Sequence, residues 1–209
     1  MLRNSRVIPV LTVERTEDAA PLARALVAGG LKYLEVTLRT PVALEAIRIM
    51  ADEVPDAVVG AGTVRNTEDL DKVYRAGARF AVSPMWTEEL AIAVLESPFP
   101  WLPGVMTPTE AVRAYDYGSD VLKLFPAKIA GGLGFLKAIG GPMPDLRFCP
   151  TGGIDANTFR DYLALPNVLC VGGSWVATRA LIAEGNWAEI TRLAAEASSD
   201  SLENDDERD

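Results

Sequence analysis

Histidine is absent from this chain of 209 residues. No imidazole is therefore available as a base, a nucleophile or a metal ligand. Acid–base chemistry near neutral pH must instead come from carboxylates, lysine, tyrosine, cysteine or a group of the substrate.

Cysteine is almost as scarce. Only Cys149 and Cys170 are present, and each lies inside an apolar run. Two cysteines exclude a disulfide framework, and without histidine they leave a zinc site short of its usual ligands. The sequence therefore favours packing in the core for both residues, and we expect neither a metal nor another cofactor.

Long apolar runs and basic clusters are also missing. No run approaches the ~20 residues needed to cross a bilayer, and the first ten residues, "MLRNSRVIPV", lack the apolar segment and cleavage site of a secretory signal. No cluster of Lys and Arg suggests a nucleic-acid surface. We expect a cytoplasmic protein without a membrane or nucleic-acid partner.

Charge is unevenly placed along the chain. The formal net charge is −9, and residues 200–209, "DSLENDDERD", contribute −5 of it through six acids and one arginine. Such a segment is typical of a disordered, solvated tail. Hydrophobic residues make up 49% of the chain and charged residues 23%, a globular balance. We therefore expect one domain over 1–199, followed by a tail over 200–209.

Short β-branched runs alternate with longer helical patterns over most of the chain. This alternation predicts parallel strands joined by helical crossovers. The predicted strands are 7–13, 33–38, 58–64, 80–84, 101–105, 121–126, 147–153 and 168–173, and amphipathic segments lie between them.

Eight such units predict a single closed (β/α)₈ TIM barrel, an α/β fold. An open, doubly wound sheet is the alternative. No G-x-G-x-x-G follows the first predicted strand to support it.

The second predicted strand, "LEVTLRT", carries polar residues among apolar ones. Period-2 alternation places Glu35, Thr37 and Arg39 on one face of the strand. A shared polar face predicts a lined cavity, whereas a structural Glu35–Arg39 ion pair is the simpler alternative. In "GAGTV" of the third strand, glycines allow close approach and Thr63 offers a hydroxyl.

Lys123 lies in the middle of "VLKLFP", an apolar predicted strand. Burial disfavours the ammonium form, so a lysine at this position can act as a free amine that attacks a carbonyl and forms a Schiff base. A purely structural pair between Lys123 and Glu35 or another carboxylate remains the alternative.

Glycine pairs end the seventh and eighth predicted strands, in "TGGI" and "GGSW". Loops after these strands form the usual phosphate site of barrels. Gly152, Gly153, Gly172 and Gly173 expose backbone N–H groups there, and Ser174 adds a hydroxyl. The pattern predicts a phosphate site.

Together, "VTLRT", "GAGTV", "SP" at 83–84, "KLFPA", "FCPTGG" and "GGSW" resemble the signature stretches of the 2-keto-3-deoxy-6-phosphogluconate (KDPG) aldolases. The resemblance runs from about residue 6 to residue 199, with its motifs in order. Lys128 is a local departure, since the family has an acid after "FPA".

The resemblance implies a role for each matching position. Lys123 would be the Schiff-base lysine and Glu35 the general acid and base, while Arg39 and Thr63 would hold the substrate carboxylate. The remaining substrate-binding residues would be Pro84, Phe125 and Thr151 around the pyruvate portion, and Gly152, Gly153 and Ser174 around the phosphate.

The implied activity is that of a class I aldolase. It would cleave phosphorylated KDPG to pyruvate and glyceraldehyde 3-phosphate, and would also act on 4-hydroxy-2-oxoglutarate. The family implies a homotrimer. Alternatives are an aldolase for the galactonate isomer, a phosphate-binding isomerase or epimerase without a covalent intermediate, and a non-catalytic sugar-phosphate binder.

Overall fold

The computed structural model describes residues 5–97 and 99–199. Within these residues the elements are, in order, β1 (Val7–Leu11), η2 (Thr16–Asp18), α1 (Ala19–Ala28), β2 (Tyr33–Thr37), α2 (Ala43–Glu53), β3 (Val58–Gly62), α3 (Thr67–Arg75), β4 (Ala81–Val82), α4 (Glu88–Glu96), β5 (Trp101–Leu102), β6 (Gly104–Val105), α5 (Pro108–Asp116), β7 (Val121–Leu124), α6 (Gly132–Gly140), β8 (Arg147–Phe148), α7 (Phe159–Leu163), β9 (Val171–Gly173), η3 (Trp175–Ala177), α8 (Arg179–Ala183) and α9 (Trp187–Ser199). The predicted tail, 200–209, lies outside the described residues.

The strands form two parallel sheets. Six strands in the order β5-β4-β3-β2-β1-β9 make a half-barrel, and β6-β7-β8 make a second sheet. In the larger sheet, Glu35 of β2 lies opposite Val10 of β1 and Gly60 of β3. In the smaller one, Lys123 of β7 lies opposite Gly104 of β6.

The fold belongs to the α/β class, as predicted. The prediction of a closed eight-stranded barrel is wrong, because hydrogen bonding from strand to strand is interrupted between the two sheets. The run 101–105, expected as one strand, divides at Pro103 into β5 and β6. Proline has no N–H to donate to a ladder. On the other side, β8 has two residues, and isolated bridges from Phe148 to Val168 and from Thr151 to Gly172 join its end to the chain around β9.

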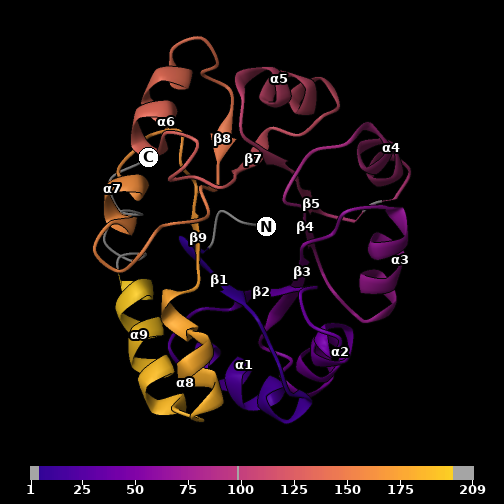
Figure 1. The fold of residues 1–209 in the computed structure, drawn as a ribbon, viewed down its shortest axis with the longest axis vertical. Helices are drawn as coiled ribbons and strands as arrows, with labels where there is room; N and C mark the ends of the chain where they lie inside the picture. Colours follow the sequence, from indigo (N-terminus) through magenta and orange to yellow (C-terminus); the bar gives the residue numbers. More distant parts are fainter. Residues whose placement is uncertain (1–4, 98, 200–209) are drawn as a thin grey trace.

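The helices lie outside the strands, and α9 lies beside α1 and α8 (Figure 1). Alternation of strand and helix explains this layer, since parallel strands require crossovers that cover the outer face. Among the described helices, none is long and apolar enough to cross a membrane.

Apolar side chains form two clusters. The larger one unites strand residues with helix residues such as Leu22, Ile47 and Leu90. The smaller one has no helical member, and it consists of Ile8, Phe80, Val82, Leu102, Cys149 and Cys170. Both cysteines are unpaired and buried, so the prediction that they pack in the core is confirmed.

Candidate active site

Lys123 and Glu35 form a buried ion pair. The Nζ atom of Lys123 lies 3.0 Å from Oε1 and 3.4 Å from Oε2 of Glu35, although the residues are 88 positions apart. Their side chains are 6% and 4% exposed. Strands β2 and β7, which belong to different sheets and do not pair with each other, thus bring a carboxylate and a lysine together in a place that water hardly reaches. Removal of either partner would leave the other as an uncompensated buried charge, which is strongly destabilising.

Gly62 makes room for the carboxylate of this pair, and Gly104 makes room for the backbone at Pro84. A Cβ atom on Gly62, at the end of β3, would lie 2.2 Å from Oε1 of Glu35. A Cβ atom on Gly104, which is opposite Lys123, would lie 2.3 Å from the carbonyl carbon of Pro84. The glycines of "GAGTV" predict close approach of other groups, and Gly62 permits it for the Glu35 carboxylate.

Thr63 and Pro84 follow strands β3 and β4 and are half-buried. Thr63 has a φ of 66°, a left-handed conformation that is uncommon for a residue other than glycine. Backbone strain of this kind is found where surrounding structure holds a residue in place, often in functional sites. Neither residue lines the pocket described next.

A pocket of about 390 Å³ opens at the carboxyl ends of the strands. It contains six of the ten predicted site residues: Arg39, Phe125, Thr151, Gly152, Gly153 and Ser174. Phe125 connects the pocket to the ion pair, since its ring centroid lies 5.3 Å from the Nζ atom of Lys123. Thr37, expected beside Glu35 and Arg39, is fully buried and donates a hydrogen bond to the carbonyl of Leu11.

The Cys170 thiol is buried near enough to Glu35 to feel its charge, but it is not a nucleophile. A hydrogen bond with Cys149 and burial raise the pKa of the Cys170 thiol well above its ordinary value, and the charge of Glu35 acts in the same direction. The thiol therefore stays protonated, whereas the thiolate is the reactive form. Within residues 5–97 and 99–199, no group of three or more acids or cysteines is placed to hold a metal ion.

The chain matches a known protein family over most of its length. A family model described as "Aldolase: KDPG and KHG aldolase" matches residues 1–193. The chain belongs to the KDPG and KHG aldolase family.

Individual members of the KDPG and KHG aldolase family match over nearly their whole length. The 2-dehydro-3-deoxy-phosphogluconate aldolase of Dickeya dadantii is 52% identical over 191 residues, which cover 91% of this chain and 90% of that protein. The KHG/KDPG aldolase of Escherichia coli is 50% identical over 197 residues, covering 94% and 92%.

A solved structure shares the fold. The KDPG aldolase of Legionella pneumophila, with pyruvate captured at low pH as a covalent carbinolamine intermediate, superposes with a TM-score of 0.92 at 48% identity. The match covers 94% of this chain and 96% of that one. The family predicted from the motifs is thus confirmed.

Two residues that line the 390 Å³ pocket, Thr12 and Arg179, are not among the predicted site residues. Thr12, after β1, shares a hydrogen bond of 3.3 Å with the hydroxyl of Thr37. Arg179, the first residue of α8, also lines the pocket. The sequence marks 175–182, "WVATRALI", as a candidate for the short helix of the phosphate site, but it does not single out Arg179 within that segment.

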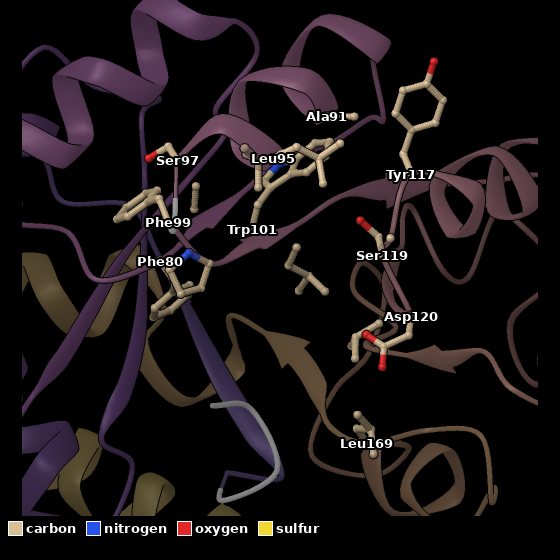
Figure 2. A pocket seen from close by; sticks show the side chains of 16 residues that line it. Phe80, Ala91, Leu95, Ser97, Phe99, Trp101, Tyr117, Ser119, Asp120 and Leu169 are labelled. Carbon is tan, nitrogen blue, oxygen red and sulfur yellow. The ribbon is translucent and has the colours of Figure 1, made fainter.

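A second cavity, of about 500 Å³, lies at the opposite end of the strands of this aldolase-family chain. Most of its lining residues lie before or within β4, β5, β7 and β9, and Ala91, Val94 and Leu95 of α4 complete the lining. Figure 2 shows Phe80, Phe99 and Trp101 on one side and Tyr117, Ser119 and Asp120 on the other. No predicted site residue lines it, so the smaller pocket remains the candidate active site.

Proposed function

We propose that this chain is a class I aldolase that cleaves KDPG to pyruvate and glyceraldehyde 3-phosphate, and that it also cleaves 4-hydroxy-2-oxoglutarate. The observation that carries the proposal is the buried pair of Lys123 and Glu35, 3.0 Å apart, beside a polar pocket. The names of the relatives at about half identity agree with this activity.

The first half of the reaction forms the Schiff base. Glu35 accepts a proton from the ammonium of Lys123, since the two groups are already hydrogen-bonded. The neutral amine attacks the C2 ketone and gives a carbinolamine. Glu35 returns a proton to the carbinolamine hydroxyl, water leaves, and an iminium remains on Lys123.

The second half breaks the C3–C4 bond. Glu35, directly or through a water molecule, takes the proton of the C4 hydroxyl, and the bonding electrons of C3–C4 pass to the iminium nitrogen as an enamine. Glyceraldehyde 3-phosphate leaves. A proton from Glu35 reaches C3, and water hydrolyses the iminium to release pyruvate and restore the amine.

Substrate binding is assigned to the residues that the family resemblance implies. Arg39 and Thr63 hold the carboxylate, because a guanidinium presents two donors to two oxygens. Pro84, Phe125 and Thr151 enclose the pyruvate portion. The backbone N–H groups of Gly152 and Gly153 and the hydroxyl of Ser174 receive the phosphate. Binding the distal phosphate positions the bond that breaks.

Borohydride trapping tests the covalent step. With pyruvate and borohydride, one reduced pyruvate should become attached to the peptide that contains Lys123. Lys123→Arg should lose both the adduct and turnover, while Lys128→Arg, a matched change five residues on, should keep them. An unmodified wild-type enzyme would favour the isomerase or epimerase alternative, which has no covalent intermediate.

Two assays resolve the remaining alternatives. Turnover of the gluconate and galactonate isomers of the substrate distinguishes the two aldolase activities, and we expect the gluconate isomer to be preferred. A non-catalytic sugar-phosphate binder would turn over neither.

The proposed assembly is a homotrimer, and the proposed location is the cytoplasm. Large apolar side chains are exposed after three strands: Met85 (38%), Met106 (40%) and Ile129 (76%). Exposed apolar side chains that form one contiguous patch are typical of surfaces that another protein chain covers. Light scattering should give three times the 22.4 kDa mass of the chain.

A further inference from the structure

Arg179 gives the candidate active site an unusual charge. Among the residues that line the pocket, two are charged, Arg39 and Arg179, and both are cations. The pocket therefore has no carboxylate in its lining, although the whole chain has a net charge of −9. A cationic concavity in an acidic protein favours an anionic ligand.

The two arginines come from different parts of the fold. Arg39 follows β2, which also carries Glu35. Arg179 lies five residues after Ser174 and beside the glycine loops assigned to the phosphate. Thr178 fixes the backbone there, because its hydroxyl accepts a hydrogen bond of 3.3 Å from the N–H of Leu181. A keto acid with a carboxylate at one end and a phosphate at the other matches two separate cations.

Glu14 holds Arg179 only weakly. The Nε atom of Arg179 lies 3.7 Å from Oε1 of Glu14, and the side chains are 65% and 58% exposed. This separation exceeds that of a hydrogen bond, and exposed ion pairs contribute little free energy. Glu14 does not line the pocket. The guanidinium can therefore leave Glu14 for a stronger anion at small cost.

We propose that Arg179 exchanges Glu14 for the phosphate of the substrate and so selects phosphorylated keto acids over unphosphorylated ones. The inference rests on the proposed aldolase activity. The glycine N–H groups orient the phosphate but carry no net charge. Arg179 adds a full charge and two parallel donors, which match phosphate oxygens. A substrate that ends in a hydroxyl leaves Arg179 with Glu14.

Steady-state kinetics with two substrates test this selection. KDPG and the same sugar acid without its phosphate, 2-keto-3-deoxygluconate, are compared for each variant. Arg179→Ala should raise KM for KDPG by roughly 3- to 10-fold, the effect of losing an exposed ion pair to a doubly charged phosphate. It should leave kcat for KDPG, and both constants for the unphosphorylated acid, within about twofold, because chemistry at Lys123 is untouched. Arg179→Lys should restore part of the loss.

Glu14→Gln provides a test in the opposite direction. Removing the competing carboxylate should lower KM for KDPG by up to about fivefold, the effect of an exposed ion pair. Lys128→Ala is the matched control. It also removes a cation beside Gly153, but Lys128 does not line the pocket, so KM for KDPG should change by less than about twofold.

Several outcomes would overturn the assignment of Arg179. They are equal losses on both substrates for Arg179→Ala, a rise in KM for Glu14→Gln, or the same rise for Lys128→Ala as for Arg179→Ala. Pyruvate carries no phosphate, so borohydride trapping should be unchanged in Arg179→Ala. Absence of trapping in the wild-type enzyme would instead contradict the aldolase activity itself, which keeps the two failures distinguishable.

Discussion

Lys123 and Glu35 compensate each other's charge in a site where either alone would be costly. A buried ammonium or carboxylate without a partner is strongly disfavoured, whereas the hydrogen-bonded pair is tolerated. The pair also holds the two groups in the geometry that a proton transfer needs. The resting state is therefore one proton away from a nucleophilic amine.

Glu35→Gln should lower kcat by about 10²- to 10⁴-fold, the usual contribution of a general acid or base. Thermal unfolding should also occur at a lower temperature, because the Lys123 ammonium loses its counter-charge. Glu45→Gln, on the surface of α2 and paired with Arg48, is the control and should retain turnover. A Glu35→Gln enzyme with wild-type kcat would remove Glu35 from the mechanism.

Gly62→Ala should impair the same pair sterically. The new Cβ would lie 2.2 Å from Oε1 of Glu35, which forces the carboxylate to move and should reduce kcat/KM by at least about tenfold, since small displacements of catalytic groups are costly. Gly134→Ala on α6 is the matched control, because nothing lies within 4 Å of its added Cβ. Comparable losses in both variants would contradict the steric argument.

One property makes Lys123 and Glu35 recognisable in the sequence. Lys123 and Glu35 are charged groups inside apolar strands, and such placement is rare enough to stand out. Arg179 is a charged residue in a short surface helix, where charge is ordinary. Its place in the lining of the pocket depends on how the chain turns after β9, which local patterns do not encode.

At the scale of elements, α5 has the most complete start. The Thr107 hydroxyl accepts a hydrogen bond from the N–H of Glu110, and the Glu110 carboxylate accepts bonds from the N–H groups of Met106 and Thr107. This capping box satisfies donors that the first turn of a helix leaves free. The adjacent Pro108 needs no partner for the N–H that it lacks.

The pKa of Glu110 makes this cap sensitive to acid. Burial acts to raise the pKa, but the N–H groups of Met106 and Thr107 and the Thr107 hydroxyl outweigh it, so the pKa lies below its ordinary value of 4.5. A lowered pKa stabilises the folded state above the unfolded value, and this contribution is lost as the pH falls through the folded one.

Glu110→Gln should therefore be less stable than the wild type at pH 7 by about 0.5–1 kcal/mol, the usual effect of a charge at a helix start. The difference should disappear as the pH falls below about 4.5 and the wild-type carboxylate becomes protonated. Urea unfolding at several pH values measures it. A difference that persists unchanged in acid would contradict the charge argument.

The division of the run 101–105 shows what element-scale patterns miss. "WLPGV" has the composition of one buried strand, yet Pro103 separates β5 from β6, which belong to different sheets. Alternation of strands and helices correctly predicts parallel pairing. The ladder is interrupted between β5 and β6 and between β8 and β9, which are consecutive along the chain. A two-residue strand such as β8 carries too little pattern to reveal such an interruption.

At the scale of the whole molecule, α9 joins the two ends of the described chain. Thr191 donates a hydrogen bond to the carbonyl of Ala25, and Ser198 donates one to the carbonyl of Gly29. A Cβ on Gly29 would lie 2.5 Å from that of Ala194. Backbone contact this close requires small residues on both helices.

Ala194→Leu should therefore destabilise the fold by about 1–3 kcal/mol, the usual cost of overpacking. Ala195→Leu, one residue further along the same helix and exposed, is the matched control and should change stability by less than about 0.5 kcal/mol. Urea unfolding monitored by tryptophan fluorescence measures both. Equal effects would show that α9 does not pack tightly on α1.

Pairing of β1 with β9 has a consequence for synthesis on the ribosome. Val7 lies opposite Val171, and Ile8 lies opposite Gly172, so one edge of the first strand stays unpaired until the last described strand has been synthesised. At about 5–20 residues per second, that wait is roughly 10–30 s. During translation the nascent chain therefore presents an uncapped strand edge to other chains, and productive folding depends on keeping that edge apart from neighbours until the final strand emerges.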